Sequence, residues 1–296
     1  MSSTVTNNFS GCFVALITPM FENGDVDYSG LKKLVDWHIE SGTDGLVILG
    51  TTAETATLTE QEQAQVLDVA IAQNQGRLPL IVGNGLNCTR STIEKTKQLD
   101  NLEIDGYLTV TPYYNKPSQK GMVEHFKAVA AVTSKPVILY NVPSRTGVDL
   151  SNESVFELMA VDNIVGIKDA TGDLSRVSAM KQQDPSFLLF GGDDLTSQHY
   201  LSLGGDGVIS VTANVEPELM QKMVKASIAD IQKDAELYDE KLCLLHRDLF
   251  IEPNPVPTKW ALKEKGLISS DMVRLPLLTM EPNNHKTIKL ALQHVN

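Results

Sequence analysis

Eight apolar, β-rich segments recur along this chain of 296 residues, and their repetition limits the possible folds more than any other feature. Most are continuous runs of Val, Ile and Leu rather than alternating apolar and polar residues. Continuous runs are typical of strands that are buried on both faces, as in a parallel sheet covered by helices. The segments are 12–20, 45–52, 78–85, 106–114, 136–143, 163–170, 187–194 and 206–214.

The stretches between these segments carry helical patterns. In 27–42 the apolar residues recur with a period of about 3.6, and Gly42 closes the stretch. Thr59 and Glu62 form the signature of a capping box at the start of another helix. Another one-sided apolar stripe lies in 121–132. Weaker patterns of comparable length follow in 152–160, 173–183 and 195–203.

Strand and helix therefore alternate, which predicts an α/β protein with the (β/α)8 fold, the TIM barrel. An open doubly wound sheet is the main alternative, but its GxGxxG fingerprint is absent after the first strand, where the turn reads TPMFENGD. The chain after residue 214 is helical and has no linker. We expect a catalytic barrel over 1–225 and a C-terminal helical extension over 226–296 that packs on it.

Composition and charge narrow the functional classes. The chain is 42% hydrophobic and 21% charged, and no apolar run approaches the roughly 18 residues of a membrane span. Residues 1–10 are polar and do not resemble a secretory signal, so we expect a cytoplasmic protein. A net charge of −12 disfavours nucleic acid as a partner. An anionic substrate would need local cations, for which Lys168 and Arg145 are candidates.

The cysteines and histidines give no sign of a disulfide or of a metal site. Cys12, Cys88 and Cys243 lie far apart without paired spacing, which favours reduced thiols that serve in packing. The six histidines are scattered, without a pair at helical spacing. We therefore expect neither a disulfide framework nor a metal cofactor.

Barrel enzymes build their active sites at the carboxyl ends of the strands, so the residues that close each apolar run are the candidates. Lys168 is the most unusual of them, because it follows the buried run 164–167 at the tip of a strand. The other strand ends supply hydroxyl groups, one guanidinium group and a glycine: Thr51, Thr52, Tyr113, Tyr114, Tyr140, Arg145 and Gly192.

Lys168 is suited to covalent catalysis if its amine is neutral. The reference pKa of lysine is about 10.4, so burial at the barrel mouth and the nearby cation Arg145 would have to lower it. A neutral amine forms an imine with a 2-oxo acid, and the imine nitrogen then serves as the electron sink without any cofactor. Tyr140 would transfer protons while the imine forms.

Each of these residues also has a structural interpretation. Lys168 could form an ion pair with Asp169, and Arg145 could be a surface charge. Thr51 and Thr52 could cap the helix that follows them. The adjacent tyrosines could be packing aromatics, and because neighbours in sequence point different ways, at most one of them would serve a given pocket.

Several longer motifs occur together: GTTAETATL (50–58), TVTPYYNKPSQKG (109–121), ILYNVPSRTG (138–147), GIKDATG (166–172), GGDD (191–194), GVISVTANV (207–215) and EPNPVPTKWAL (252–262). In this combination the sequence resembles the dihydrodipicolinate synthase family from Phe9 to its last helix. The resemblance implies a lyase of the class I aldolase type. Such an enzyme condenses pyruvate with L-aspartate 4-semialdehyde to 4-hydroxy-tetrahydrodipicolinate, on the diaminopimelate route to lysine.

The resemblance also implies a role for each matching residue. Lys168 would form the imine with pyruvate, and Tyr140 would protonate and deprotonate it. Thr51 would link Tyr140 to Tyr114 of a neighbouring subunit, which implies a tight homodimer that the family commonly pairs into a tetramer. Substrate contacts would come from Thr52 to the pyruvate carboxylate, Arg145 to the semialdehyde carboxylate, and Gly192 and the main chain of Ile209 in the pocket wall.

The sequence departs from the family pattern in two places. The usual GTTGES reads GTTAET, and we expect the extra methyl of Ala53 to fit unless that position needs a positive φ. Lysine-inhibited members carry histidines and a glutamate in a cleft at the dimer interface. The matching positions here are Glu60, Gln63 and Ser91, while Asn87 and Tyr113 are kept. Loss of the glutamate carboxylate should weaken lysine binding by about 1.5–3 kcal/mol, so we hypothesise weak or absent feedback inhibition by lysine.

Two alternative functions remain open at the level of sequence. The first is a sister lyase, such as an N-acetylneuraminate lyase or a 2-keto-3-deoxy-sugar-acid aldolase. Arg145 argues against it, because a cation suits the semialdehyde carboxylate better than the hydroxyls of a sugar acid. The second is a non-catalytic sensor of 2-oxo acids, for which both Lys168 and Tyr140 would be unnecessary.

Overall fold

Eight parallel strands close into a barrel in chain order in the computed structural model, which describes residues 9–295. Each strand overlaps one of the predicted segments, so the barrel is confirmed and the open doubly wound sheet is excluded. Of the predicted lead-in, residues 1–8 lie outside the described residues. The strands are β1 (Gly11–Ala15), β2 (Gly45–Ile48), β3 (Leu80–Gly83), β4 (Gly106–Val110), β5 (Val137–Asn141), β6 (Ile164–Asp169), β7 (Leu188–Gly191) and β8 (Gly207–Ser210).

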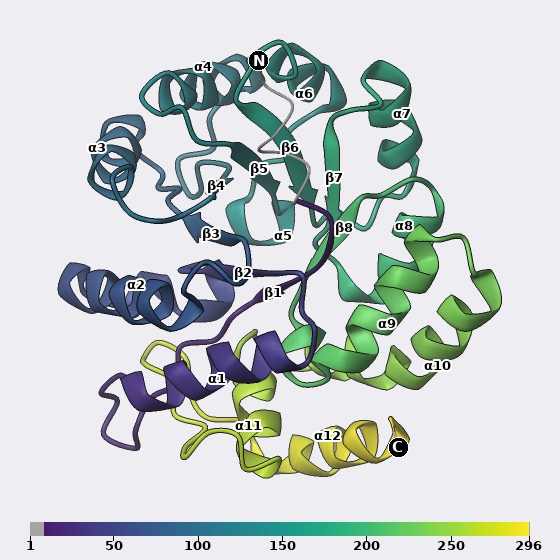
Figure 1. Cartoon of the computed structure of the whole chain (residues 1–296). Helices are drawn as coiled ribbons and strands as arrows, with labels where there is room; N and C mark the ends of the chain where they lie inside the picture. The colour runs from purple at the N-terminus through teal and green to yellow at the C-terminus, as the bar shows by residue number, and fades with distance from the viewer. Residues whose placement is uncertain (1–8, 296) are drawn as a thin grey trace.

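Helices surround the strands on the outside of the barrel (Figure 1). The capping box of α2 is confirmed, because the Thr59 side chain accepts from the Glu62 amide and the Glu62 side chain accepts from the Thr59 amide. The helix α3 and the single turn α5 were not predicted. The helices that follow β1 to β7 are α1 (Tyr28–Glu40), α2 (Glu60–Asn74), α3 (Thr89–Leu99), α4 (Gln119–Ala130), the single turn α5 (Pro143–Thr146), α6 (Asn152–Leu158), α7 (Ser175–Gln183) and α8 (Ser197–Ser202).

Aromatic side chains fill the barrel interior near the end where the strands begin. The Phe13 ring lies 5.5 Å from the Phe190 ring and 6.2 Å from the Phe9 ring, both in edge-to-face contact. Gly45 lies against Phe13, where a β-carbon would approach the ring to 2.1 Å. The interior is a packed core at this end, so ligands are accommodated at the opposite, carboxyl-terminal end of the strands.

Four further helices complete the chain and gather on one side of the barrel in Figure 1. They are α9 (Pro217–Ile228), α10 (Gln232–Asp248), α11 (Val256–Glu264) and α12 (Pro282–His294). The expected boundary between residues 225 and 226 falls inside α9. We propose that the division into barrel and extension be kept, with its boundary at the turn 229–231 between α9 and α10.

The three cysteines are free thiols, but they do not share one environment. Cys12 is buried, Cys243 is partly buried and Cys88 is exposed. The interpretation of all three as packing residues is therefore wrong for Cys88, which precedes α3 at the surface.

Among residues 9–295, every helix is too short or too polar to cross a membrane.

Buried His38 of α1 predicts a loss of stability in acid. Its Nδ1 lies 3.2 Å from Thr43 Oγ1, and burial lowers its pKa from 6.5 to about 3. Below about pH 6.5 the unfolded chain binds a proton here, whereas the folded chain does so only near pH 3. The free energy of unfolding should therefore fall by about 1.4 kcal/mol for each pH unit below 6.5 on account of this residue.

A His38→Gln variant tests this expectation by urea unfolding at neutral pH and near pH 5. Its stability should fall about 2 kcal/mol less than that of the wild type between the two conditions. Exposed His199 provides the matched control, because His199→Gln should keep the wild-type dependence. An identical loss in all three proteins would contradict the assignment.

Candidate active site

Lys168 lies near the carboxyl end of β6 and points into the barrel mouth. Lys168 is 5% exposed, and its Nζ lies 4.5 Å from the ring centroid of Tyr140. Tyr140 is the residue of β5 that pairs with Lys168 in the sheet register. Tyr140 is itself 7% exposed. The amine is therefore held against an aromatic face in a largely water-excluded setting.

Asp169 is not the partner of Lys168. Successive side chains of a strand point to opposite faces, so Asp169 faces the helices, where its Oδ2 accepts from Arg176 Nε at 2.6 Å. Its Oδ1 accepts from the Thr171 amide at 2.9 Å. Among the ion pairs of residues 9–295 none involves Lys168, so the predicted alternative of an ion pair with Asp169 is wrong.

Gly192, just after β7, leaves the space that the Lys168 side chain occupies. A β-carbon on Gly192 would lie 2.8 Å from Lys168 Cε and 3.0 Å from Ala170 Cβ. Any larger residue would push the lysine stem out of its position. The glycine of the GGDD motif is thus required by the close approach of Lys168.

A cavity of about 500 Å3 opens above the Lys168 amine. Its walls combine the strand-end residues with a loop from the C-terminal extension. The active-site cavity is lined by Thr51, Thr52, Tyr140, Val142, Ser144, Arg145, Lys168, Ala170, Gly192, Asp193, Val211 and residues 250–254. Ile209, by contrast, packs in the barrel core, and Val211 lines the cavity two residues later.

Asn254 connects two of the predicted substrate-binding residues. Its Nδ2 donates to Thr52 Oγ1 at 2.9 Å, and its carbonyl oxygen accepts from Arg145 Nη2 at 3.4 Å. Because Thr52 accepts this bond, its hydroxyl hydrogen is free to donate to a ligand. Arg145 is exposed and forms no ion pair among the described residues, so its guanidinium is available at the cavity entrance.

The loop that carries the threonines is a pair of short 3-10 turns rather than a helix cap. Thr51–Ala53 forms the first turn, and the cap of α2 is Thr59, so the capping interpretation of the threonine pair is wrong. The residue with positive φ in this loop is Glu54, at 56°. Ala53 has no such requirement, which confirms that its methyl group fits.

Glu54 is held in place by the C-terminal extension. Its Oε1 accepts from Nζ of fully buried Lys259 at 2.5 Å, and its Oε2 accepts from the Arg274 amide at 2.9 Å. Lys259 also donates to the Met272 carbonyl at 2.7 Å. Burial lowers the pKa of Lys259, and the Glu54 carboxylate counteracts that shift. This buried pair fixes the threonine loop against α11.

The adjacent tyrosines point in different directions, as expected. Tyr113 lines a second cavity, whereas Tyr114 is 87% exposed and lines neither cavity of its own chain. Tyr114 also has a φ of 76°, a conformation that is strained for a bulky residue. Its side chain is thus directed away from Lys168 of the same chain.

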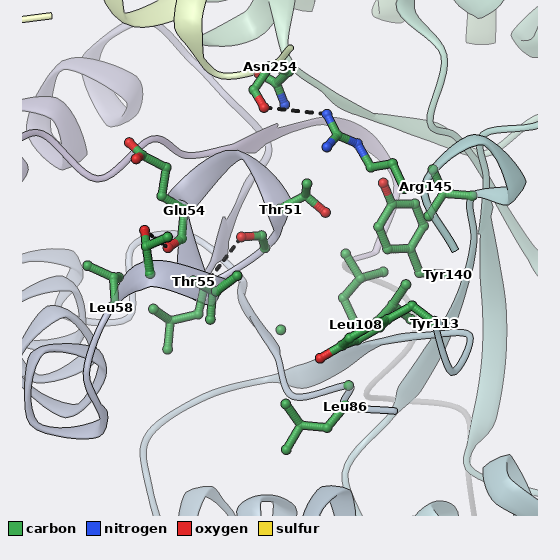
Figure 2. Close-up of a pocket in the computed structure, with 18 of the residues that line it drawn as sticks. Thr51, Glu54, Thr55, Leu58, Leu86, Leu108, Tyr113, Tyr140, Arg145 and Asn254 are labelled. Atoms are coloured by element: carbon green, nitrogen blue, oxygen red, sulfur yellow. Dashed lines mark hydrogen bonds between the residues drawn. The ribbon is translucent and has the colours of Figure 1, made fainter. Parts of the chain in front are cut away.

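The second cavity, of about 590 Å3, adjoins the first at the residues that both share. Figure 2 shows the Thr51 hydroxyl on the side that faces Tyr140, and Arg145 reaching Asn254. Of the five allosteric candidates, Gln63 and Tyr113 line this cavity. Glu60 is exposed, Ser91 and Asn87 are partly buried, and the Asn87 carbonyl accepts from Asn115 Nδ2 at 2.8 Å.

The strand-end residues lie together around the two cavities, as the sequence predicts. Three residues at or beside these cavities, Asn254, Lys259 and Lys95, were not predicted. Asn254 and Lys259 belong to the motif EPNPVPTKWAL, which is a detectable signal, but the motif does not end a strand. Lys95 lies on the unpredicted helix α3.

Within residues 9–295 no cluster of three or more His, Cys, Asp and Glu side chains is arranged to hold a metal ion.

Fold and site together define a (β/α)8-barrel enzyme that presents a buried amine at the carboxyl end of a strand. The model of the dihydrodipicolinate synthetase family matches residues 8–295, and the chain belongs to this family. The chain is 47% identical over 287 residues to the 4-hydroxy-tetrahydrodipicolinate synthase of Shigella dysenteriae serotype 1, covering 97% of this chain and 98% of the relative.

Solved structures agree with this membership. Dihydrodipicolinate synthase of Acinetobacter baumannii, in complex with pyruvate, superposes with a TM-score of 0.94 at 45% identity, covering 97% of this chain and 98% of that one. A monomeric dihydrodipicolinate synthase variant gives a TM-score of 0.94 at 35% identity, covering 97% of both chains.

Proposed function

We propose that this protein is a lyase that condenses pyruvate with L-aspartate 4-semialdehyde to 4-hydroxy-tetrahydrodipicolinate. The observation that carries the proposal is Lys168, a buried amine without a carboxylate partner, which opens into a cavity beside Tyr140. The names of the relatives support the same reaction. The product belongs to the diaminopimelate route of lysine biosynthesis.

The reaction uses the chain's own groups in sequence. The Lys168 amine attacks the keto carbon of pyruvate, and Tyr140 transfers protons while water leaves and the imine forms. The iminium nitrogen accepts electrons when the methyl carbon loses a proton, and the resulting enamine attacks the aldehyde. The semialdehyde's amine then displaces Lys168 from the former keto carbon, which closes the ring and releases the enzyme. No separate cofactor takes part.

Thr52 and Arg145 would bind the two substrate carboxylates. The Thr52 hydroxyl, whose oxygen accepts from Asn254, donates to the carboxylate of pyruvate. The Arg145 guanidinium at the cavity entrance pairs with the carboxylate of the semialdehyde. Gly192 keeps the Lys168 stem in position.

Arg145→Leu is expected to raise the semialdehyde KM and lower kcat strongly, with kcat/KM falling at least about 100-fold, because the charge-assisted hydrogen bonds that orient the aldehyde are lost. Imine formation with pyruvate should be unchanged, as measured by borohydride trapping. Lys116→Met, an exposed charge on a nearby loop, serves as the matched control. A variant that loses trapping as well would show that Arg145 acts on the amine rather than on the second substrate.

A coupled assay with both substrates tests the function as a whole. Product formation from pyruvate and the semialdehyde is the expected result. Cleavage of N-acetylneuraminate or a 2-keto-3-deoxy-sugar acid without this condensation would favour a sister lyase. Pyruvate binding without any turnover would favour a sensor.

We further propose that the active form is a tight homodimer in which Tyr114 completes the partner's site, with dimers pairing into a tetramer. Its exposure and its position outside both cavities of its own chain support this. Mixing inactive Lys168→Ala and Tyr114→Phe chains provides the test, because only a tyrosine acting on the partner's site leaves one intact site in the mixed dimer. Activity that does not recover on subunit exchange would contradict the proposal.

Feedback inhibition by lysine is expected to be weak or absent. Gln63 and Ser91 offer no carboxylate to an incoming ammonium group, and Asn87 and Tyr113 alone do not replace it. The carboxylate of Glu60 is exposed and does not line the second cavity. Initial rates measured during a lysine titration test this expectation, and inhibition at submillimolar lysine would contradict it.

We also propose a cytoplasmic location, which fractionation of the source cells would test.

A further inference from the structure

The active-site cavity contains a carboxylate that has no role in the reaction as described so far. Asp193 follows Gly192 after β7, and it lines the cavity together with Lys168 and Arg145. These three charged residues come from neighbouring strands, because Arg145 follows β5, Lys168 lies near the end of β6, and Asp193 follows β7. The reactive amine is therefore flanked by a cation on one side and a carboxylate on the other.

Its own chain uses only part of the Asp193 carboxylate. Oδ2 accepts from Thr196 Oγ1 at 2.7 Å in the turn that follows. A β-carbon on Gly172, in the loop after β6, would lie 3.9 Å from the same oxygen. Oδ1 accepts no hydrogen bond from residues 9–295, and Asp193 forms no ion pair with any of them, Lys168 included. One carboxylate oxygen is thus free to accept from a ligand.

The other carboxylate that lines the cavity is engaged elsewhere. Glu252 lies in the loop before α11, and its Oε1 accepts from the Glu281 amide at 3.0 Å and from Asn284 Nδ2 at 2.7 Å. Both donors lie at the start of α12. The Glu252 side chain is therefore held toward the C-terminal extension, and Asp193 is the carboxylate that remains for a ligand among the described residues of the cavity.

A free carboxylate is unfavourable in this cavity unless a cation meets it. Both substrates of the proposed reaction carry a carboxylate, which Asp193 repels, and a ligand that fills the cavity also displaces water from Asp193 Oδ1. The ammonium group of the semialdehyde is the only cationic group that the two substrates bring. It is bonded to the same carbon atom as the carboxylate that pairs with Arg145, so that carbon would lie between a cation and a carboxylate of the protein.

We propose that Asp193 binds the ammonium group of L-aspartate 4-semialdehyde and thereby selects aldehydes that carry an amino group, a role that rests on the function proposed above. The selection has a chemical consequence, because the amine releases the product by displacing Lys168. An aldehyde without an amino group would form a carbon–carbon bond with the enamine, but its adduct could not free Lys168 by closing a ring. Recognition of the ammonium group before that bond forms keeps such aldehydes out of the site.

Asp193→Asn tests this role and preserves the turn, because the amide oxygen can still accept from Thr196. The probe is 4-oxobutanoate, which has the chain, the aldehyde and the carboxylate of the semialdehyde but no amino group. In the variant the semialdehyde KM should rise at least about tenfold, whereas the inhibition constant of 4-oxobutanoate against the semialdehyde should stay the same or fall. Borohydride trapping with pyruvate should remain at the wild-type level.

Asp173→Asn is the matched control, because it removes an exposed carboxylate from the loop after β6 that does not line the cavity. Both of its constants should stay at the wild-type values. An unchanged semialdehyde KM in Asp193→Asn, or a parallel rise of the KM and the inhibition constant, would overturn the role of Asp193 while the proposed function stands. A wild-type protein that does not condense the two substrates would contradict the proposed function and this role with it.

Discussion

Lys168→Met is expected to lower kcat of the condensation by at least about 1,000-fold, because it removes the only group proposed to bond covalently to pyruvate. Methionine has a similar length and fits the space that Gly192 leaves, so the barrel should fold as before. Thermal unfolding at a temperature equal to or above that of the wild type would verify this. Initial rates in the coupled assay with both substrates measure the effect.

Lys33→Met is the matched control for this experiment, because Lys33 is an exposed lysine on α1, remote from the barrel mouth. It should keep the wild-type rate. A Lys168→Met protein that turns over at the rate of Lys33→Met would contradict the covalent mechanism. The fold would stand, but the roles of Tyr140, Thr51 and Thr52 would have to be assigned anew.

The second large effect is expected on stability. Lys259→Met should lower the free energy of unfolding by about 3–5 kcal/mol, because it leaves the buried Glu54 carboxylate without its counter-charge. The Lys259 side chain is 0% exposed and that of Glu54 is 2% exposed, so water cannot replace the lost partner without rearrangement. Urea unfolding at neutral pH measures the change.

Two further variants separate loss of the charge pair from loss of packing. Lys259→Met combined with Glu54→Gln should recover part of the stability, because no uncompensated charge remains. Lys263→Met removes the ion pair between Lys263 and Asp271, in which the lysine side chain is 43% exposed. This substitution should lower the free energy of unfolding by at most about 1 kcal/mol. Equal losses for Lys259→Met and Lys263→Met would show that the buried pair has no special weight.

The barrel was predictable because its signal is local and repeated. Each strand is a continuous apolar run with a helical pattern behind it, and eight such units leave few alternative topologies. Helix α3 escaped prediction because its inward face is polar. Thr92 and Thr96 are fully buried there, and their hydroxyl groups donate to the Cys88 and Thr92 carbonyls instead of presenting an apolar stripe.

The site was predictable only as far as strand ends define it. Tyr140 and Lys168 lie near the ends of the adjacent strands β5 and β6, and Arg145 follows β5 in the turn α5, so barrel geometry alone brings them together. Asn254 and Lys259 meet their partners across 202 and 205 residues of sequence, and no local pattern reports such a contact. The exposed setting of Tyr114 likewise becomes visible only when its backbone conformation is known.

Borohydride reduction in the presence of pyruvate traps the imine and so reports whether Lys168 bonds to the substrate. A stable mass increase is expected on the peptide that contains Lys168, and it should be absent without pyruvate and absent in Lys168→Met. A mass increase on a different lysine, or none at all in a protein that still makes product, would contradict it.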